Sequence, residues 1–447
     1  MAKGSETNRK AGIAGLKNIF RSLQYRNYRL FFGGQSISLI GTWIQRIAMP
    51  WLVYDLTNSV FLLGFVGFVG QIPTFLLSPF AGVLTDRWNR YYILIATQIL
   101  AMLQAVILTW LVFNGTVQVW HIILLSGFLG CINAFDIPAR QSFVIQMVEK
   151  KEDLGNAIAL NSSMVNGARL LGPSLAGVLI ATTGEGVCFL LNALSYVFVI
   201  WSLLMMKVAK KEKNKEHKPV LTEFKEGFLY TFGSVPLKYI ILLLALVSLM
   251  GMPYTVLMPV FAKEVLHGGS HTFGFLMGAT GLGALTGALY LASRKNVLGL
   301  DKLIPLAAAV FGLGLILFAL SHFYILSLVL LVFTGLGMML QMASSNTMLQ
   351  TIVDDNMRGR VMSFYTMAFM GTAPFGSLLA GSLASKIGAP NTLLFGGIAC
   401  VAGAVIFARK LPEFKKIIQP IYSRLGLTNE KISTIQTVTE ISCPEED

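Results

Sequence analysis

The chain contains repeated apolar segments of about 20 residues, and these limit its possible folds more than any other feature. A helix rises about 1.5 Å per residue, so each segment can cross about 30 Å of hydrocarbon. About twelve such segments are present, at residues 30–54, 60–83, 91–113, 119–146, 156–182, 187–206, 237–262, 272–293, 302–320, 324–350, 360–386 and 391–409. The short alternating segments of a transmembrane barrel are absent from the sequence. The sequence therefore predicts an all-α membrane protein with twelve transmembrane helices.

The amount and placement of charge support a membrane protein. Only 13% of the residues are charged, whereas a soluble domain has about a quarter. The net charge of +13 could indicate a nucleic-acid partner, but Lys and Arg gather at the N-terminus, near residues 87–90, 207–225 and 358–360, and after Arg409. Lys and Arg are thus concentrated in the segments expected on one side of the membrane, as the positive-inside rule describes. It predicts a multi-pass protein of the cytoplasmic membrane with both termini in the cytoplasm, the lipid bilayer as partner and no nucleic acid.

Motifs for other protein classes are missing from the sequence. The first apolar segment follows about 28 polar residues and is too long for the core of a cleavable signal peptide, which has about 7–15 residues. The four cysteines form neither a disulfide framework nor a zinc-binding spacing. There is no Walker sequence, HExxH or GxSxG. We therefore expect no enzyme activity, no cofactor and no metal.

Glycines recur at a fixed offset and indicate an internal duplication. Four glycines around the fifth segment each have a counterpart 204 positions later: Gly167, Gly172, Gly177 and Gly184 match Gly371, Gly376, Gly381 and Gly388. A second echo relates Asp55 to Glu264, 209 positions on. A duplicated unit is expected to repeat its sequence at a constant period. We therefore predict two related six-helix bundles.

The polar stretch after residue 206 is the longest interruption between apolar segments and divides them six and six. The predicted organisation is a cytoplasmic N-terminal segment, an N-terminal bundle, a cytoplasmic linker, a C-terminal bundle and a cytoplasmic tail, at residues 1–29, 30–206, 207–236, 237–410 and 411–447. Two joined bundles suit a transporter with substrate bound between them at the membrane midplane. The same plan could serve a receptor that transports nothing.

Residues 82–90 read GVLTDRWNR and lie between the second and third apolar segments. This stretch resembles the signature loop of the major facilitator superfamily, Gly-x-Leu-x-Asp-Arg-x-x-Arg, with Gly82, Leu84, Asp86, Arg87 and Arg90 in the defining places. Residues 133–177 further resemble the enterobactin-exporter and macrolide-efflux branch of that superfamily.

The resemblance implies a secondary active transporter that works as a monomer by alternating access. The implied cargo is a small organic molecule, either a siderophore or a drug-like compound, exported across the cytoplasmic membrane in exchange for protons. An importer or a lipid flippase on the same fold stays open as an alternative, as does a membrane receptor.

The same resemblance assigns the loop to an inner gate. Asp86 would meet the start of the eleventh helix, where an acid is favoured by about 0.3–1 kcal/mol. Arg87 or Arg90 would pair with Asp136 of the fourth helix. The alternative is a surface hinge that only follows the positive-inside rule. Arg140 follows Asp136 by four residues, the favourable order for a helical ion pair, so these two could instead neutralise each other.

Charged groups inside the apolar segments cost at least about 2.5–3.5 kcal/mol each and need partners or water. Arg46 and Arg169 are candidates for binding an anionic or carbonyl-rich substrate, although each could instead fix helix contacts. Four amides are weaker substrate-binding candidates and could equally join helices: Gln45, Asn133, Gln341 and Asn346. Asp136 is the only clearly embedded acid and the one plausible proton site.

The fifth segment carries a Gly-Pro pattern made of Gly167, Gly172, Pro173 and Gly177, which resembles a helix-five motif of superfamily exporters. Ala176 stands where the family form has glycine. Glycines allow helices to approach closely, and the proline can kink the helix.

Overall fold

The computed structural model describes residues 21–148, 150–207, 220–294 and 297–424. Within these ranges every regular element is helical and there is no strand, which confirms the predicted all-α fold. Parts of the predicted N-terminal segment, linker and tail lie outside the described residues, at 1–20, 208–219 and 425–447. The side chains of Asp86 and Arg87 also lie outside what is described.

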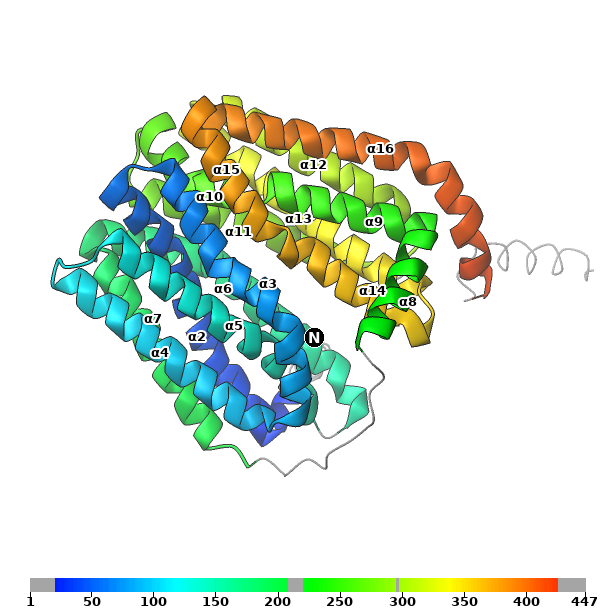
Figure 1. The fold of residues 1–447 in the computed structure, drawn as a ribbon, viewed down its shortest axis with the longest axis horizontal. Helices are drawn as coiled ribbons and strands as arrows, with labels where there is room; N and C mark the ends of the chain where they lie inside the picture. The colour runs from blue at the N-terminus through cyan, green and yellow to red at the C-terminus, as the bar shows by residue number, and fades with distance from the viewer. Residues whose placement is uncertain (1–20, 149, 208–219, 295–296, 425–447) are drawn as a thin grey trace, which may run out of the picture.

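The N half, residues 21–207, contains one short 3₁₀ turn and six helices (Figure 1). They are η1 (Arg21–Gln24), α2 (Arg26–Thr57), α3 (Val60–Arg87), α4 (Arg90–Phe113), α5 (Val119–Gln146), α6 (Lys151–Thr183) and α7 (Glu185–Leu204). In this half α2 packs against α6 and α7, α3 against α5, and α4 against α5 and α7.

The C half, residues 220–424, contains helices interrupted by π-helical turns. They are α8 (Val220–Gly233), α9 (Val235–Leu246), η2 (Val247–Gly251), α10 (Tyr254–Val260), η3 (Phe261–Val265), α11 (Ser270–Ser293), α12 (Leu300–Leu320), α13 (Tyr324–Ile352), α14 (Asp355–Thr366), η4 (Met367–Gly371), α15 (Ala373–Ile387) and α16 (Ala389–Arg424). Here α13 packs against α11 and α12, and α16 packs against α12 and α9. The last helix continues well beyond the predicted apolar segment 391–409, and α8 lies within the predicted linker.

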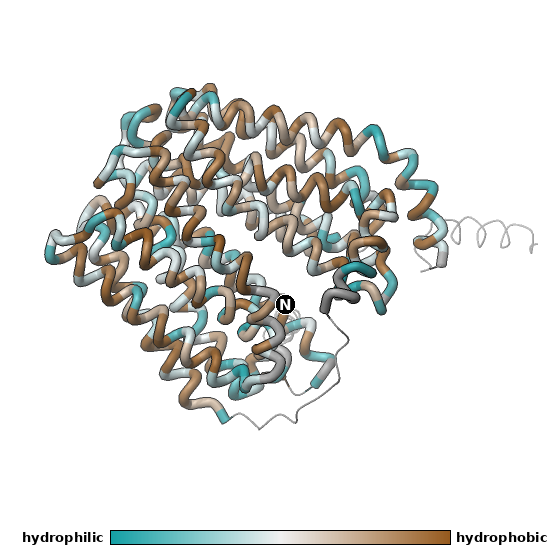
Figure 2. Tube along the Cα trace, in the orientation of Figure 1, coloured by the Kyte–Doolittle hydropathy of each residue, from teal (hydrophilic) through white to brown (hydrophobic). Residues whose placement is uncertain are grey.

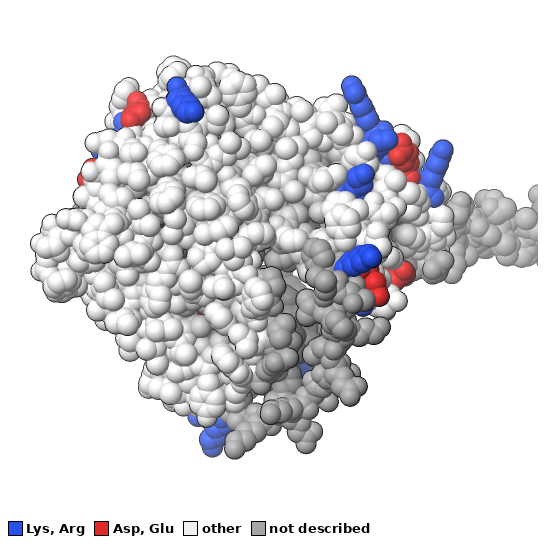
Figure 3. All heavy atoms as spheres, viewed as in Figure 1, with Lys and Arg blue, Asp and Glu red and all other residues white. Residues whose placement is uncertain are grey.

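Eleven segments of the described chain are helical, long and apolar enough to cross a membrane. The 32-residue α2 is long enough but is not among them, because it carries polar groups such as Gln35, Gln45 and Arg46. Figure 2 shows hydrophobic residues along the helices and hydrophilic ones gathered toward helix ends such as that of α16. On the face in Figure 3, charged atoms lie near the edges and leave a wide uncharged band between them. This band is the surface expected of a protein embedded in lipid.

The two halves meet toward one end of the molecule, which we call the closed end. It contains the helix junctions at residues 58–59, 184, 266–269 and 388. The halves join along α6 with α11 and along α3 with α15. A Cβ atom placed on Gly177 would lie 2.7 Å from Cα of Gly274, and one on Gly381 would lie 2.7 Å from Cα of Gly64. Only glycine permits such close backbone contact.

Gly177 and Gly381 are one of the glycine pairs that the sequence relates by a 204-residue offset. Each now lies at the crossing of a helix from one half with a helix from the other half. Another pair, Gly184 and Gly388, ends α6 and α15 with φ angles of 83° and 84°. Glycine adopts this positive-φ conformation at low cost. The repeated glycines therefore mark equivalent joints of the two halves.

The opposite end, which we call the linker end, contains the α3–α4 junction at residues 88–89, the α5–α6 junction and the α13–α14 junction. Its described ion pairs each join groups of one half: Arg21 pairs with Asp153, and Arg360 pairs with Glu226 at 2.6 Å. A hydrogen bond of 2.7 Å to the Asp153 carboxylate raises the pKa of the Tyr25 phenol.

The packing of the linker end also stays within each half. α14 packs against α8, α9 and α13, and a separate apolar cluster of the N half contains Tyr28, Phe31 and Phe143. In Figure 1 the ends of α3 and α14 diverge here, whereas α3 and α15 run side by side toward the closed end. The two halves are therefore joined from the middle of the molecule to the closed end.

Candidate functional site

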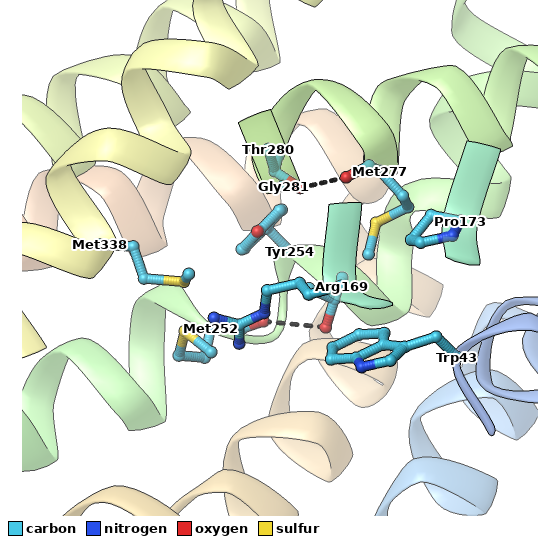
Figure 4. A pocket seen from close by; sticks show the side chains of 10 residues that line it. Trp43, Arg169, Pro173, Met252, Tyr254, Met277, Thr280, Gly281 and Met338 are labelled. Atoms are coloured by element: carbon cyan, nitrogen blue, oxygen red, sulfur yellow. Dashed lines mark hydrogen bonds between the residues drawn. The ribbon is translucent and has the colours of Figure 1, made fainter. Parts of the chain in front are cut away.

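A small cavity of about 40 Å³ lies in the middle of the molecule, where the halves meet (Figure 4). The N half contributes Trp43 of α2 with Arg169 and Pro173 of α6. The C half contributes residues from the η2–α10 region, α11 and α13, namely Met252, Tyr254, Thr255, Met277, Thr280, Gly281 and Met338. A drug-sized ligand needs about 300–1,000 Å³. The cavity is therefore the narrow meeting point of two walls.

Two arginines share one tryptophan in the wall of the N half. The guanidinium carbon of Arg46 lies 4.7 Å from the centre of the Trp43 ring, and that of Arg169 lies 5.5 Å from it. Figure 4 shows Arg169 extending from α6 toward Met252 with the Trp43 ring beside it. A cation over an aromatic face gains about 0.5–2 kcal/mol. This is less than the cost of at least about 2.5–3.5 kcal/mol for each charge in a membrane.

Neither guanidinium has an ion-pair or hydrogen-bond partner among the described residues. The backbone carbonyl contacts that could have satisfied Arg169 are not formed there. Arg46 lies in the middle part of a packed helix and is nevertheless exposed. Its charge is also repelled by those of Arg169 and Arg140. Because Trp43 lines the cavity beside both arginines, this exposure is that of a group facing the space between the halves.

The wall of the C half is apolar and soft. Met277 and Met338 are buried, Met252 is half-buried, and Tyr254 is buried beside them. Methionine side chains are flexible and polarisable and fit ligands of different shapes. The site therefore has a cationic wall in one half and an adaptable apolar wall in the other.

Gln45 lies on a different face of α2 from its neighbour Arg46. It is buried, accepts a hydrogen bond of 2.7 Å from Asn192 of α7, and donates one of 3.0 Å to Gln104 of α4. Its amide thus joins three helices within the N half, which is the helix-joining role that the sequence left open.

The other amide candidates do not gather around Trp43. Gln341 is buried and its amide nitrogen lies 3.5 Å from Ser345 on its own helix. Asn346 accepts a hydrogen bond of 2.9 Å from Gln350, also on α13. Asn133 of α5 is half-buried. Of the six candidates for substrate binding, the structure brings together only Arg46 and Arg169.

Asp136 is buried between α4 and α5. Its carboxylate accepts a hydrogen bond of 2.7 Å from Gln98, lies 3.0 Å from the Thr97 hydroxyl, and lies 3.6 Å from the Arg140 guanidinium. The pairing with Arg140 that the four-residue spacing allowed is thus present. The acid of the predicted gate is held by groups of its own half.

The predicted signature loop joins α3 to α4. Gly82, Leu84, Asp86 and Arg87 belong to the last part of α3, Arg90 begins α4, and the side chain of Asn89 caps α4 by accepting from the Tyr91 backbone amide. The start of α14, the predicted partner of Asp86, packs against other helices of the C half.

The residues of the Gly-Pro pattern of α6 differ in how closely they are packed. A Cβ atom on Gly172 would lie 2.4 Å from the Cβ atom of Trp43, and Gly177 meets Gly274 as described above. Gly167 has open space around its missing side chain, so close packing does not explain it. Pro173 lies inside α6 and lines the cavity. Gly172 thus permits Trp43 to lie against α6 beside Arg169.

None of the polar contacts that join the two halves at the closed end was predicted from the sequence. The buried hydroxyl of Tyr54 on α2 hydrogen-bonds to Glu264 of η3. Lys263 of η3 lies 3.1 Å from the Asp55 carboxylate and 3.3 Å from the Asn58 amide oxygen. The signal was the 209-residue echo of Asp55 and Glu264. The same offset relates Tyr54 to Lys263, so the two contacts are equivalent under the repeat.

The described residues offer no binding site for a resident metal ion. Among them, no group of three or more His, Cys, Asp or Glu residues could hold a metal ion. The described cysteines, Cys131, Cys188 and Cys400, are free thiols.

The chain is similar to a known protein family and to several characterised proteins. The model of a family described as transmembrane secretion effector matches residues 18–428. The staphyloferrin A transporter of Staphylococcus aureus is 27% identical over 383 residues, which cover 85% of this chain and 95% of that relative. Macrolide efflux protein A of Streptococcus pyogenes is 23% identical over 405 residues, covering 88% of this chain and 99% of that relative.

Solved structures share the fold at lower sequence identity. A bacterial homologue of the iron transporter ferroportin, in an inward-facing state, matches with a TM-score of 0.64 and 18% identity, covering 86% of this chain and 98% of that one. A POT family transporter in complex with a thioalcohol-conjugated peptide matches with a TM-score of 0.70 and 13% identity, covering 87% and 96%.

Proposed function

The chain belongs to the transmembrane secretion effector family of the major facilitator superfamily, and we propose that it exports a small organic molecule by alternating access. As a member of that superfamily it is a small-molecule transporter and a multi-pass protein of the cell membrane. The cargo class that we propose is a siderophore or a drug-like compound. The names of the relatives support this class, since they include a siderophore transporter and a macrolide efflux protein.

The observation that carries the proposal is the one-sided contact between the halves. They are joined from the cavity to the closed end, and their described linker-end contacts stay within each half. A transporter that rocks two bundles about a central site has this shape in one of its two main states. We propose that the domains are the two six-helix bundles 30–206 and 237–410, and that α2 crosses the membrane as the twelfth span.

In this proposal the linker end and both termini face the cytoplasm, so the structure is the inward-facing state. The excess of Lys and Arg at this end supports the orientation through the positive-inside rule. Asp86 would reach the N-terminus of α14 only in the outward-facing state, when the linker end closes. The separation of α14 from α3 in the present state is consistent with an open inner gate.

Proton antiport is part of the proposal, and Asp136 is its candidate site. The carboxylate is buried and is held by Arg140, Gln98 and Thr97. Protonation would weaken the attraction to Arg140, which would then be free to move. The protein is proposed to act as a monomer, because both walls of the cavity come from one chain.

The test is export by cells that carry or lack the gene. We expect cells without it to retain a metabolite that carrier cells secrete, or to become sensitive to a drug. In liposomes loaded with that compound, an imposed proton gradient should accelerate its movement. Equal retention by both cell lines would contradict export, and transport without any pH dependence would contradict antiport.

A second candidate, movement of a lipid-like amphiphile, is favoured by one observation. An apolar groove of about 600 Å³ on the N half is lined by Trp88, Tyr92, Phe128, Cys131 and Phe135 among others. An acyl chain could enter such a groove from the membrane. Filling it with Ala96→Phe should leave export of a water-soluble cargo unchanged, whereas a tenfold loss of transport, about 1.4 kcal/mol, would favour the amphiphile.

A further inference from the structure

Arg46 and Arg169 form an unusual pair of membrane-embedded charges. Their guanidinium groups lie over the same Trp43 ring, and among the described residues neither has a carboxylate or carbonyl partner. The two positive charges also repel each other. A purely structural arginine in a membrane is expected to be paired or bonded to backbone carbonyls. No described protein group therefore neutralises the two charges.

The acid that is clearly embedded in the sequence, Asp136, cannot neutralise the pair without breaking other contacts. Asp136 is already held by Arg140, Gln98 and Thr97. Arg140 adds a third positive charge that acts on Arg46. The N-half wall therefore has more positive than negative charge, and it faces the space between the halves.

The facing wall adds a second requirement. Met252, Met277 and Met338 with Tyr254 present thioethers and an aromatic ring to the same cavity. These groups favour a polarisable or apolar body and include no carboxylate that could neutralise the arginines. A small inorganic anion would leave this wall without a partner.

We propose that Arg46 and Arg169 bind the acidic groups of an organic anion that carries at least two negative charges and an apolar body. Both guanidinium groups lie within 5.5 Å of the centre of the Trp43 ring, so that each can donate its hydrogen bonds to one acidic group of the same ligand, and the methionine wall covers the rest of the ligand. The inference rests on the proposed transport function for its biological meaning, but the binding site itself can be tested without transport.

The experiment measures binding to the purified full chain in detergent. The probe is naphthalene-2,6-dicarboxylate, and its matched neutral control is naphthalene-2,6-dicarboxamide. Calorimetry gives the dissociation constant, and thermal unfolding gives the stability with and without the probe. We expect saturable binding of the dicarboxylate, weakened by salt, and at least about tenfold weaker binding of the diamide.

The variants separate a binding role from a structural one. Arg46→Gln and Arg169→Gln should each weaken dicarboxylate binding by about tenfold or more, while the ligand-free variants unfold at the same or a higher temperature because one repelling charge is gone. Arg46→Lys should bind with intermediate affinity, since it keeps the charge but loses the planar group that lies over Trp43. Lys386→Gln removes an exposed charge at the closed end and should bind like the parent chain.

Three results would overturn the inference: no saturable binding of the dicarboxylate, equal binding of the diamide, or unchanged affinity in both arginine variants with lowered ligand-free stability. Failure of the proposed function is a separate result. Charge-dependent binding without export in cells would leave the site standing and remove the exporter. Export in cells without charge-dependent binding of the dicarboxylate would leave the exporter and remove the site.

Discussion

The closed end and the linker end of the molecule are built from different contacts. At the closed end, backbones approach at Gly177 with Gly274 and at Gly64 with Gly381, and polar pairs join α2 to η3. At the linker end, the described ion pairs and the packing of α14 stay within one half. Close glycine contact needs no ordered side chains, so it can form and separate at a small entropic cost.

The two kinds of contact suggest how one chain could adopt two states. The closed-end contacts follow the internal repeat, with equivalent residues on both halves, so neither half has to deform when they separate. The within-half pairs of the linker end keep each bundle rigid during such a movement. Altering the cross-half contacts should therefore change the balance of states, whereas altering within-half contacts should change only stability.

Gly381→Leu should have the largest effect. A Cβ atom added at this position would lie 2.7 Å from Cα of Gly64 and 3.1 Å from the Val60 carbonyl oxygen, both backbone atoms that cannot move aside. Overpacking costs about 1–3 kcal/mol. The population of the state in which the halves are in contact at the closed end should therefore fall roughly tenfold or more. Transport in cells should fall by a similar factor.

The control for this variant is Gly167→Ala, because the space around Gly167 is open. It should transport at the parental rate. If Gly381→Leu also transports normally, the glycine crossing is not a moving joint.

Tyr54→Phe should have the next largest effect. It removes the cross-half hydrogen bond to Glu264 and leaves the ring in place. Hydrogen bonds to charged groups contribute about 1.5–3 kcal/mol, and Glu264 is exposed, so we expect the lower part of that range. The readout is an increase in labelling of a cysteine placed at Met252 by a reagent added from the closed-end side.

Tyr28→Phe is the matched control for Tyr54→Phe. The Tyr28 hydroxyl donates to the Ala157 carbonyl oxygen at 2.8 Å within the N half. This change should lower the unfolding temperature without increasing the labelling. Equal labelling of both variants would show that the Tyr54 contact does not control opening.

Asp86→Asn should affect transport while leaving the unfolding temperature nearly unchanged. In the proposed outward-facing state, Asp86 would lie at the N-terminus of α14, an interaction of about 0.3–1 kcal/mol. Its loss should favour the present state and slow transport severalfold. Asp301→Asn, at the first turn of α12, is the control that should transport normally. Undiminished transport by Asp86→Asn would remove the inner gate.

Lys263→Gln should have the smallest effect. The Lys263–Asp55 pair is exposed, and such pairs contribute about 0–1 kcal/mol. We expect less than about a fivefold increase in closed-end labelling, decreasing further in high salt. Lys410→Gln breaks an exposed pair with Glu413 inside α16 and should give no increase. A large effect of Lys263→Gln would make the charged pair, rather than the glycine contact, the main closure.

The sequence predicted features that depend on local spacing and repetition. The apolar segments predicted the helices, the 204-residue offset related Gly177 to Gly381, which the structure places at equivalent crossings of the two halves, and the four-residue spacing allowed the Asp136–Arg140 pair. Gln45 and Arg46 show the limit of such reasoning. The two polar residues are adjacent in one segment, but only the packing of α4 and α7 decides that Gln45 is enclosed while Arg46 stays exposed beside Trp43.

Trp43 shows a second limit. An aromatic residue in an apolar segment gives no signal of its own, and its role emerges only when Arg46 and Arg169 lie beside it. The contacts of Tyr54 and Lys263 depend on how the two halves are arranged, which no local pattern encodes.

Alternating movement of the two halves can be tested by two spin-label distances, measured by pulsed electron paramagnetic resonance in a background without cysteines. One pair carries labels at Thr183 and His271, exposed at the closed end, and the other at Gln146 and Asn356, exposed at the linker end. On adding the exported compound, we expect a population in which the first distance is longer and the second distance is shorter. If both distances change in the same direction, or neither changes in a chain that transports, the two halves do not alternate as proposed.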